Sequence, residues 1–496
     1  MLPRAGSAIE SPLILVIDIG SSSTRAALYD ATAAMVPGTL VQAPCALSTD
    51  ADGTAVDDPA ALLDRVVHCI DGVLAAAGPR THRIAAVGCA TYAASVLGTD
   101  AAGRPVTPIY TYADTRSAAA AESLRERLDE REIWQRTGCP LRTSYLPALF
   151  TWLAETQPQL LREAQRWMGV GEWLYYQFFS RSTITASAAS WTGLLNRVSL
   201  TWDDELLAAL PIRRGQLGSV VDLSEAYIGL RDCWGERWPA LRACPWFGAI
   251  GDGAAANIGS GCTTPDRIAL SIGTTGALRT IPRSVPIIPR GLWCYRVDRA
   301  LPLLGGATSE GGNVLAWVLR TLQVDTATLQ RHLLDPDADD NLTVLPFIAG
   351  ERGPGWAGDV RATITGISTS TSALDIARAA LEGVTYRWVH IATLLRQVLD
   401  QPPTIVVSGG AIQYVPAWAQ LIADALGLPV ATSGEPEATC RGIAVLALQS
   451  LGEITSLEER PAMLGDVVQP DPMRLAAHQA AVERQAQWYE RMYPSR

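Results

Sequence analysis

Two short segments rich in glycine and hydroxyl residues, each following an apolar run, contain the residue types that bind phosphate. They are residues 18–25 (DIGSSSTR) and 273–276 (GTTG). In the first, Gly20 permits a tight turn and a close approach of the backbone to a ligand, and backbone amides together with the hydroxyls of Ser21 and Ser22 can donate hydrogen bonds to phosphate oxygens. Both segments therefore predict phosphate contacts, although an ordinary hairpin with a polar tip is the alternative for either one alone.

Charged side chains within the first segment extend this chemistry. Asp18, at the end of a predicted strand, could hold Mg²⁺ through water, because hard cations prefer oxygen ligands. Arg25 supplies the strong cation nearby, since the sequence contains no lysine and all 40 of its Lys+Arg residues are arginine. The absence of lysine excludes a Walker A loop, a protein kinase site and Schiff-base chemistry.

A further candidate is Asp252, which follows an apolar segment in residues 251–261 (GDGAAANIGSG). A carboxylate at a turn from strand to helix can accept the proton of a substrate hydroxyl during phosphoryl transfer. Capping of the following helix is the alternative role for Asp252. His68 and His390 lie on predicted helices with apolar neighbours, so we interpret them as core residues rather than as bases.

The elements around these residues recur in the two halves of the chain. Residues 14–28 and 268–280 each predict a β-hairpin with a small, hydroxylated tip. Each hairpin is followed by a helix, a buried strand and a glycine, over residues 58–90 in the first half and 374–411 in the second. This repeated order indicates a duplicated α/β unit.

The repeat predicts two like domains, residues 1–247 and 248–496, which join where Pro and Gly interrupt the pattern. We expect the domains to face an interdomain cleft with one hairpin tip on each wall, so that a polyphosphate is clamped between them and closure excludes water. Asp58 and Asp375 are expected to cap the repeated helices. Further helices are predicted over residues 115–129, 146–156, 158–166 and 170–179, and near the C-terminus, where we interpret a long amphipathic helix as surface packing.

The composition narrows the classes of partner and location. A formal net charge of −10 argues against nucleic-acid binding, because proteins that bind polyanions present basic surfaces. The nine cysteines form no CxxC pair, which fits reduced, buried thiols. We find no signal peptide and no apolar run near the roughly 18 residues of a membrane span. A soluble, cytoplasmic protein without membrane or nucleic-acid partners is therefore expected.

Taken together, these motifs resemble those of the FGGY carbohydrate kinases, a family of the actin-like ATPase superfamily. The resemblance rests on DIGSSSTR, GDGAAANIGSG, SIGTTG and GGATSEGGNVLAW, and above all on ATITGI followed seven residues later by DIARAALE, which fits the second signature of the family in full. It extends from about residue 13 to the C-terminal helix. The resemblance implies an α/β fold of two RNase H-like domains, with ATP and Mg²⁺ used to phosphorylate a hydroxyl of a sugar or sugar acid.

The resemblance also implies roles for individual residues. Asp252 matches the catalytic base, and Asp18 and Arg25 match positions of the first phosphate motif. ATP contacts are implied for Gly20, Ser21 and Ser22 in the first motif, Gly273 and Thr274 in the second, and Gly312, Gly409, Gly410 and Ala411 near the ribose and adenine.

Other segments most resemble the gluconate-kinase branch of the family. These segments are residues 103–116, RTGCPL with the following Ser144-Tyr145, residues 187–196 and residues 346–356. The substrate wall expected from them consists of Thr91, Tyr92, Ser95, Asp114, Arg116, Tyr145 and Asp252. Ordinary loop and helix-capping roles are the alternative for the first five of these residues.

The sequence also departs from the pattern of the family. Leu149 stands where relatives usually have lysine, Ala93-Ala94 where they often have histidine, and Asn196 where Asp is common. A missing polar side chain at Ala94 removes a hydrogen bond near the sugar and could shift the preference toward another polyol.

Gluconate or a close sugar acid is therefore the expected substrate, with xylulose, ribulose and glycerol as alternatives within the family. A non-catalytic sugar sensor and a chaperone-like ATPase are the alternatives of other classes, and Asp252 and the complete second signature argue against both. The sequence leaves the sugar, the pathway and the oligomeric state open, and it is compatible with a homodimer.

Overall fold

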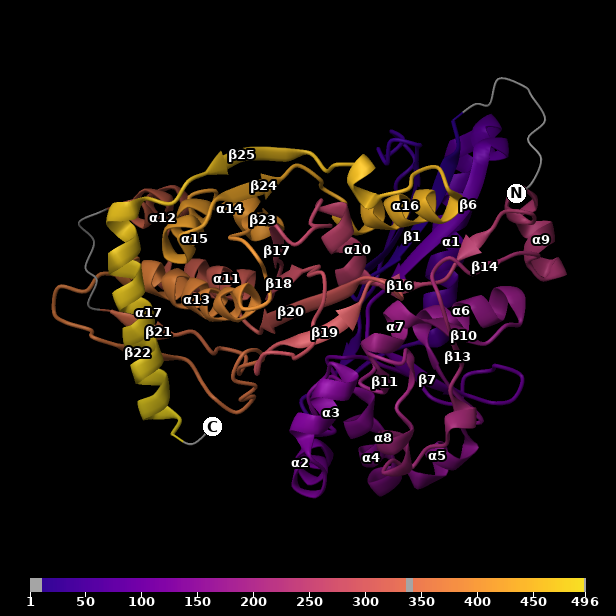
Figure 1. Ribbon diagram of the computed structural model, residues 1–496, viewed down its shortest axis with the longest axis horizontal. Helices are drawn as coiled ribbons and strands as arrows, with labels where there is room; N and C mark the ends of the chain where they lie inside the picture. Colours follow the sequence, from indigo (N-terminus) through magenta and orange to yellow (C-terminus); the bar gives the residue numbers. More distant parts are fainter. Residues whose placement is uncertain (1–10, 336–341, 495–496) are drawn as a thin grey trace. The chain divides into compact units, whose positions relative to one another are not determined.

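The computed structural model describes residues 11–335 and 342–494, which form two compact units interleaved along the chain (Figure 1). The first unit contains the described residues up to 261 together with residues 294–302 and 437–461. The second contains those of residues 262–293, 303–436 and 462 onward. These units are made of separate segments of the chain and are not the same as domains. The division into domains at residues 1–247 and 248–496 therefore stays a prediction.

The sheet of the first unit is built around strand β1 (Leu13–Ile19). This strand pairs antiparallel with β2 (Ser23–Tyr29) and parallel with β6 (Ile84–Thr91). The strand order is β14-β15-β6-β1-β2-β3, and β16 (Ile250–Gly251) also pairs with β6. The hairpin predicted over residues 14–28 and the buried strand predicted after the first helix are both confirmed.

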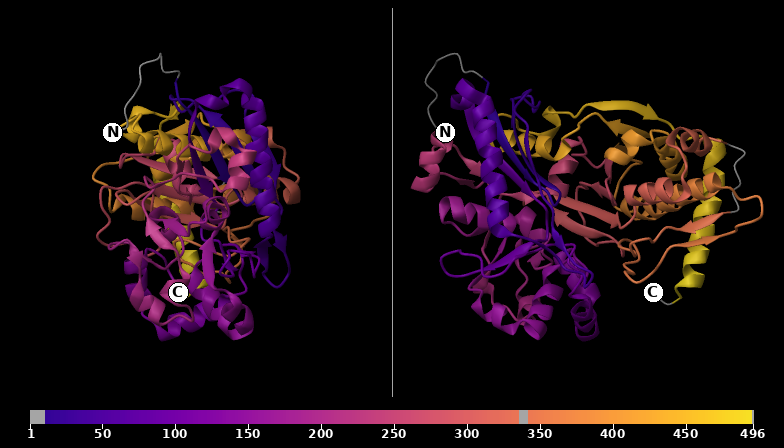
Figure 2. Two further views of the ribbon diagram at one scale, coloured as in Figure 1. Left: turned by 90° about the vertical axis from the view of Figure 1, so that its right-hand side faces the viewer. Right: turned by 180° about the vertical axis from the view of Figure 1, so that it is seen from behind.

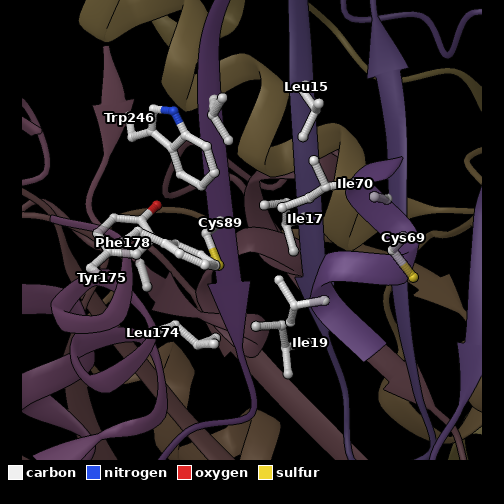
Figure 3. Close-up of a cluster of buried hydrophobic side chains, with 14 of the residues drawn as sticks. Leu15, Ile17, Ile19, Cys69, Ile70, Cys89, Leu174, Tyr175, Phe178 and Trp246 are labelled. Carbon is white, nitrogen blue, oxygen red and sulfur yellow. The ribbon is translucent and has the colours of Figure 1, made fainter. Parts of the chain in front are cut away.

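Alternate residues of β1 point to the two faces of this sheet. On one face, Leu15, Ile17 and Ile19 belong to a core cluster with α1 (Pro59–Ala77) and α6 (Val170–Phe179). Figure 3 shows this cluster, including Phe178 of α6 and Trp246. Burying each large apolar side chain stabilises the fold by roughly 1.5–3 kcal/mol. This packing therefore fixes β1, the first strand of the predicted phosphate-binding hairpin.

Helix α16 (Ala438–Leu451) packs against β1, β6 and α10 (Asp252–Gly259) (Figure 1). Glycines allow these close contacts. A Cβ on Gly88 of β6 would lie 2.5 Å from a side-chain carbon of Ile443, and a Cβ on Gly442 would lie 1.9 Å from the backbone oxygen of Ala255 in α10. A late segment of the chain therefore completes the first unit.

The second unit repeats this pattern around strand β17 (Arg267–Ile272). This strand pairs antiparallel with β18 (Gly276–Thr280) and parallel with β23 (Thr404–Ser408). The strand order of the sheet is β19-β20-β18-β17-β23-β24-β25. The predicted duplication of an α/β unit is therefore confirmed at the level of strand pairing.

The first unit contains further strands and helices, of which β3, β14 and β15 belong to the sheet around β1. They are β3 (Val41–Pro44), β4 (Ser48–Thr49), β5 (Ala55–Asp57), β7 (Val96–Thr99), β8 (Ile109–Tyr110), α2 (Ala118–Arg127), α3 (Glu130–Thr137), α4 (Leu146–Thr156), α5 (Pro158–Glu163), β9 (Arg166–Gly169), β10 (Thr183–Thr185), α7 (Ala186–Ser190), β11 (Leu195–Asn196), β12 (Thr201–Trp202), α8 (Asp204–Ala208), β13 (Ser219–Val221), β14 (Ala226–Tyr227), α9 (Asp232–Arg237) and β15 (Trp246–Phe247).

The second unit adds a set of helices and shorter strands. They are β20 (Pro302–Thr308), α11 (Gly312–Leu322), α12 (Thr326–Leu333), β21 (Thr343–Leu345), β22 (Thr363–Thr365), α13 (Ala373–Arg396), α14 (Gly410–Tyr414), α15 (Trp418–Leu426), β24 (Val430–Ser433), β25 (Leu464–Val468) and α17 (Pro472–Met492). The strand order given above also includes β19 (Trp293–Arg296), of which residues 294–296 are grouped with the first unit. Figures 1 and 2 show α17, in yellow, running past the orange strands β21 and β22.

Two local predictions were wrong for identifiable reasons. The helix expected over residues 158–166 ends at Glu163, because Arg166 begins β9, which pairs with β7. Asp375 does not cap α13 as expected: Ser372 is the cap, and its hydroxyl oxygen accepts the amide of Asp375 at 3.2 Å while Asp375 accepts the amide of Ser372 at 2.8 Å. Asp58, by contrast, caps α1 as predicted.

Candidate active site

The first phosphate segment forms the hairpin that joins β1 to β2. Gly20 donates its amide to the carbonyl oxygen of Ser23 at 2.9 Å, and Ser21 and Ser22 lie half-buried and exposed at the tip. Asp18 and Arg25 are direct partners in the antiparallel pair, so their side chains lie on the same face of the hairpin. The Arg25 Nη1 atom lies 3.8 Å from Asp18 Oδ2.

Arg25 also contacts a residue that sequence analysis missed. Its Nη1 donates a hydrogen bond of 3.1 Å to Oε2 of Glu437, the residue that precedes α16. Glu437 lies 412 positions from Arg25 in the sequence, and no local pattern marks it as functional. The contact exists because α16 returns to the first unit.

Burial and neighbouring charges act on the carboxyl group of Asp18. Its pKa is raised from the ordinary value of 3.8 to about 7, mainly because the side chain is buried. The negative charges of Asp252 and Glu437 contribute to this rise, whereas the positive charge of Arg25 opposes it. A cation bound beside Asp18 would favour its charged form, so this carboxyl is suited to a metal that arrives with a substrate.

The position of Asp252 follows from the sheet. Gly251, the last residue of β16, lies opposite Thr91 of β6, and Thr91 in turn lies opposite Ile19 of β1. All three strands run parallel, so Asp18, Thr91 and Asp252 stand at neighbouring carboxyl ends. Ligands of open α/β sheets commonly bind at this edge.

Asp252 is the first residue of α10, and its half-buried carboxylate accepts the amide of Gly253 at 2.8 Å. The capping position considered as the alternative role is held instead by Gly251. A helix N-terminus favours a negative charge, so the first turn of α10 is a favourable place for the Asp252 side chain. A Cβ on Gly251 would lie 2.4 Å from Nε1 of Trp191, so this indole, also missed from the sequence, packs directly against the backbone that precedes Asp252.

The predicted substrate loop is buried beside this edge. Thr91, Tyr92 and Ser95 line a hollow of about 30 Å³ together with Ala94, which is enough for about one water molecule. The Tyr92 hydroxyl donates to Oδ2 of Asp57 at 3.2 Å. The structure thus brings these three residues together next to Gly251, and their contact with a sugar stays a prediction.

The other predicted substrate residues bind one another or aromatic neighbours. Arg116 Nη2 lies 2.6 Å from Asp114 Oδ2, and its guanidinium lies 4.6 Å from the ring centroid of Trp152. The hydroxyl oxygens of Tyr145 and Tyr295 are 2.6 Å apart. These contacts are sufficient to fold the loops, so a substrate role for Asp114, Arg116 and Tyr145 also stays a prediction.

In the second unit, the predicted nucleotide residues meet around a pocket of about 1130 Å³. Gly273, Thr274, Gly312, Gly410 and Ala411 all line it. This volume is ample for a nucleotide, since ligand pockets typically measure about 300–1,000 Å³. The rest of the lining is largely apolar, and it includes Ile272, Leu315, Ala316, Trp317, Phe347 and Ile348.

Backbone contacts explain why glycines stand at this pocket. Gly312 donates its amide to the Gly273 oxygen at 2.8 Å, and a Cβ on Gly312 would lie 2.6 Å from that oxygen. Gly409 has φ +110°, and a Cβ there would lie 2.2 Å from the oxygen of Ile272. Around Gly410, by contrast, an added Cβ would meet open space. Backbone can therefore approach a ligand closely at Gly410.

The residues present fit a nucleotide with its magnesium ion. Within residues 11–335 and 342–494, no group of three or more His, Cys, Asp or Glu side chains is arranged to hold a metal ion alone. Mg²⁺ that accompanies phosphates needs only one or two carboxylates, because phosphate oxygens and water complete its shell. Asp18 meets that requirement.

No helix in the described part of the chain is both long and apolar enough to cross a membrane.

Comparisons with known proteins agree with this arrangement. Residues 13–259 match the N-terminal domain of the FGGY family of carbohydrate kinases, and residues 269–451 match its C-terminal domain. A gluconokinase of Bacillus subtilis (strain 168) is 28% identical over 480 residues, which cover 94% of this chain and 92% of the relative. The solved structures of a gluconate kinase and a xylulose kinase from Lactobacillus acidophilus each match with a TM-score of 0.92 and 26% identity, over 98% of this chain and 99% of theirs.

Proposed function

We propose that this chain, which belongs to the FGGY family of carbohydrate kinases, transfers the terminal phosphate of ATP to a hydroxyl of gluconate or a closely related sugar acid. Membership of the family makes the protein a phosphotransferase with a carbohydrate acceptor, as the motifs predicted. The observation that carries the site assignment is the meeting of Asp18, Thr91 and Asp252 at neighbouring strand ends.

Two observations support gluconate as the acceptor. The gluconokinase of Bacillus subtilis is similar over nearly the whole of this chain, and residues 103–116 and 346–356 resemble segments of the gluconate-kinase branch. A xylulose kinase has the same TM-score as the gluconate kinase. Fold alone therefore does not choose between these sugars, and xylulose is the second candidate.

Each residue of the first unit has a distinct task in this proposal. The Asp252 carboxylate accepts the proton of the attacking hydroxyl, a task that general bases accelerate by roughly 10²–10⁴-fold. The Arg25 guanidinium, fixed by Glu437 at 3.1 Å, offsets negative charge on the phosphoryl group. Amides and hydroxyls of residues 20–22 donate to phosphate oxygens.

The second unit contributes the nucleotide pocket, with Gly273 and Thr274 at the tip of its own hairpin. When bound, Mg²⁺ neutralises charge between the phosphates, and Asp18 would hold it. Convergence of the two hairpins on one ATP molecule is part of the proposal. We also infer that the enzyme works in the cytoplasm, because the proposed reaction uses ATP.

A panel of acceptors tests the proposal. ADP release should be measured with gluconate, xylulose, ribulose, glycerol and fuculose, using Asp252→Asn as the matched inactive variant. Gluconate is expected to have the highest kcat/KM. If xylulose or glycerol exceeds gluconate, the acceptor is wrong while the kinase assignment stands. Sugar binding in calorimetry without ADP release from any acceptor would instead favour a sensor.

A further inference from the structure

The last turn of α17 contacts a wall of the nucleotide pocket. Phe347 lines this pocket and is 0% exposed to solvent. Its ring centroid lies 5.8 Å from that of Tyr489 and 6.3 Å from that of Tyr493. Aromatic pairs at these separations attract one another. The C-terminal helix, which the sequence suggested to be surface packing, therefore supports a residue of the pocket.

Tyr489 also holds the chain that follows Phe347. Its hydroxyl donates to Oε2 of Glu351 at 2.6 Å. Glu351 is 3% exposed, forms a buried ion pair with Arg387 of α13, and accepts the amide of Gly355 at 3.2 Å. The Arg387 guanidinium lies over the rings of Phe347 and Tyr489, at 5.3 and 4.9 Å from their centroids. The position of the Glu351 side chain is thus fixed by contacts within the second unit.

Tyr493, directly after α17, holds the far end of the same segment. Its hydroxyl donates to the backbone oxygen of Arg361 at 2.6 Å and accepts the Arg361 amide at 3.2 Å. One hydroxyl therefore satisfies both backbone groups of a single residue. Arg361 and the next residue, Ala362, line the nucleotide pocket, and the Arg361 side chain is itself tied to the backbone oxygen of Val360 at 2.8 Å.

We propose that Tyr489 and Tyr493 are positioning residues for nucleotide binding, which act by fixing residues 347–361 as a wall of the pocket. This inference rests on the proposed function, because it takes the pocket to bind ATP and ADP. Neither tyrosine lines the pocket itself. Tyr489 acts through Phe347 and Glu351, and Tyr493 acts through Phe347 and Arg361. A loop fixed before binding costs less conformational entropy when the ligand binds.

Removal of single hydroxyl groups tests the proposal while each aromatic ring stays in place. Tyr493→Phe, Tyr489→Phe and the double variant should be compared with Met492→Leu, a matched change at an exposed side chain of the same turn. The probe is ADP, titrated by calorimetry without sugar, and KM for ATP and for the sugar should be measured in parallel. Thermal unfolding shows whether each variant remains folded.

Each tyrosine variant is expected to weaken ADP binding roughly three- to tenfold, the scale of one or two hydrogen bonds, and to raise KM for ATP with KM for the sugar unchanged. Met492→Leu should match the wild type. ADP affinities within twofold of the wild type, or equal increases in both KM values, would overturn the inference. Wild-type protein that binds ADP but phosphorylates no sugar would refute only the proposed function, whereas wild-type protein that does not bind ADP would refute the pocket assignment.

Discussion

Asp18→Asn is expected to end catalysis and at the same time to stabilise the first unit at alkaline pH. The pKa of Asp18 is raised from 3.8 to about 7 because the side chain is buried near Asp252 and Glu437. A carboxyl whose pKa is higher in the folded state binds its proton more tightly there, so its stability contribution is fully present below pH 3.8 and is lost as the pH rises to about 7. Above that pH the folded enzyme carries a costly buried charge.

The size of this cost follows from the two pKa values. The difference between 3.8 and about 7 corresponds to roughly 4 kcal/mol at full ionisation. Asn resembles the neutral acid, so Asp18→Asn should match the wild type near pH 4 and exceed its stability by up to about 4 kcal/mol at pH 8. The first unit comprises residues 1–261, 294–302 and 437–461. With an unfolding entropy of about 2.1 cal/mol/K per residue, that gain corresponds to a rise in Tm of roughly 6 °C.

Thermal unfolding of the ligand-free protein between pH 4 and pH 8 measures this effect. Asp64→Asn, at an exposed position of α1, is the control and should leave Tm unchanged across the range. Kinase activity of Asp18→Asn should be lost at every pH, because the metal position is removed. A Tm difference between Asp18→Asn and the wild type that does not grow with pH would refute the electrostatic argument.

Four further substitutions test three separate parts of the site. Asp252→Asn should lower kcat by roughly 10²–10⁴-fold with ADP affinity in calorimetry unchanged, and a kcat near wild type would mean that the proton leaves by another route. Glu437→Gln removes the negative charge of the partner that lies 3.1 Å from Arg25, so we expect roughly a tenfold lower kcat/KM for ATP. An unchanged value would show that Arg25 needs no charged support. Gly409→Ala should lower Tm, because its Cβ would lie 2.2 Å from a backbone oxygen. A Cβ at Gly410 meets open space, so Gly410→Ala should leave Tm unchanged and weaken ADP binding. The opposite pattern would contradict the geometry of the pocket.

The repeated hairpins were predictable because their signals are local. An apolar strand, a tip of small residues and a second strand occupy about 15 consecutive residues in each half. The position of Asp252 at a turn from strand to helix was predictable for the same reason, because the apolar strand and the helix adjoin it in the sequence. The N-cap of α13 was predicted wrongly because two suitable residues, Ser372 and Asp375, stand three positions apart. The structure shows that Ser372 is the cap.

Contacts between distant segments were beyond the sequence signal. Glu437 reaches Arg25 only because α16 returns to the first sheet. Tyr493 reaches Arg361 across 132 positions. The residues next to Tyr493 in the sequence predict only the end of an amphipathic helix. Trp191 packs on Gly251 because a missing side chain leaves room for the indole. Each of these contacts depends on how whole elements pack rather than on spacing along the chain.

The return of α16 to the first unit also sets an order of events during synthesis. Residues 437–461 belong to the first unit, so about nine-tenths of the chain must leave the ribosome before this unit contains all of its segments. Until then, the surfaces of β1, β6 and α10 that α16 covers lack their partner, and Arg25 lacks Glu437. A nascent chain that has not yet extended to α16 therefore carries Asp18, Arg25 and Asp252 without the packing that holds these segments together. A chain that stops before Glu437 is expected to lack a fully packed first unit.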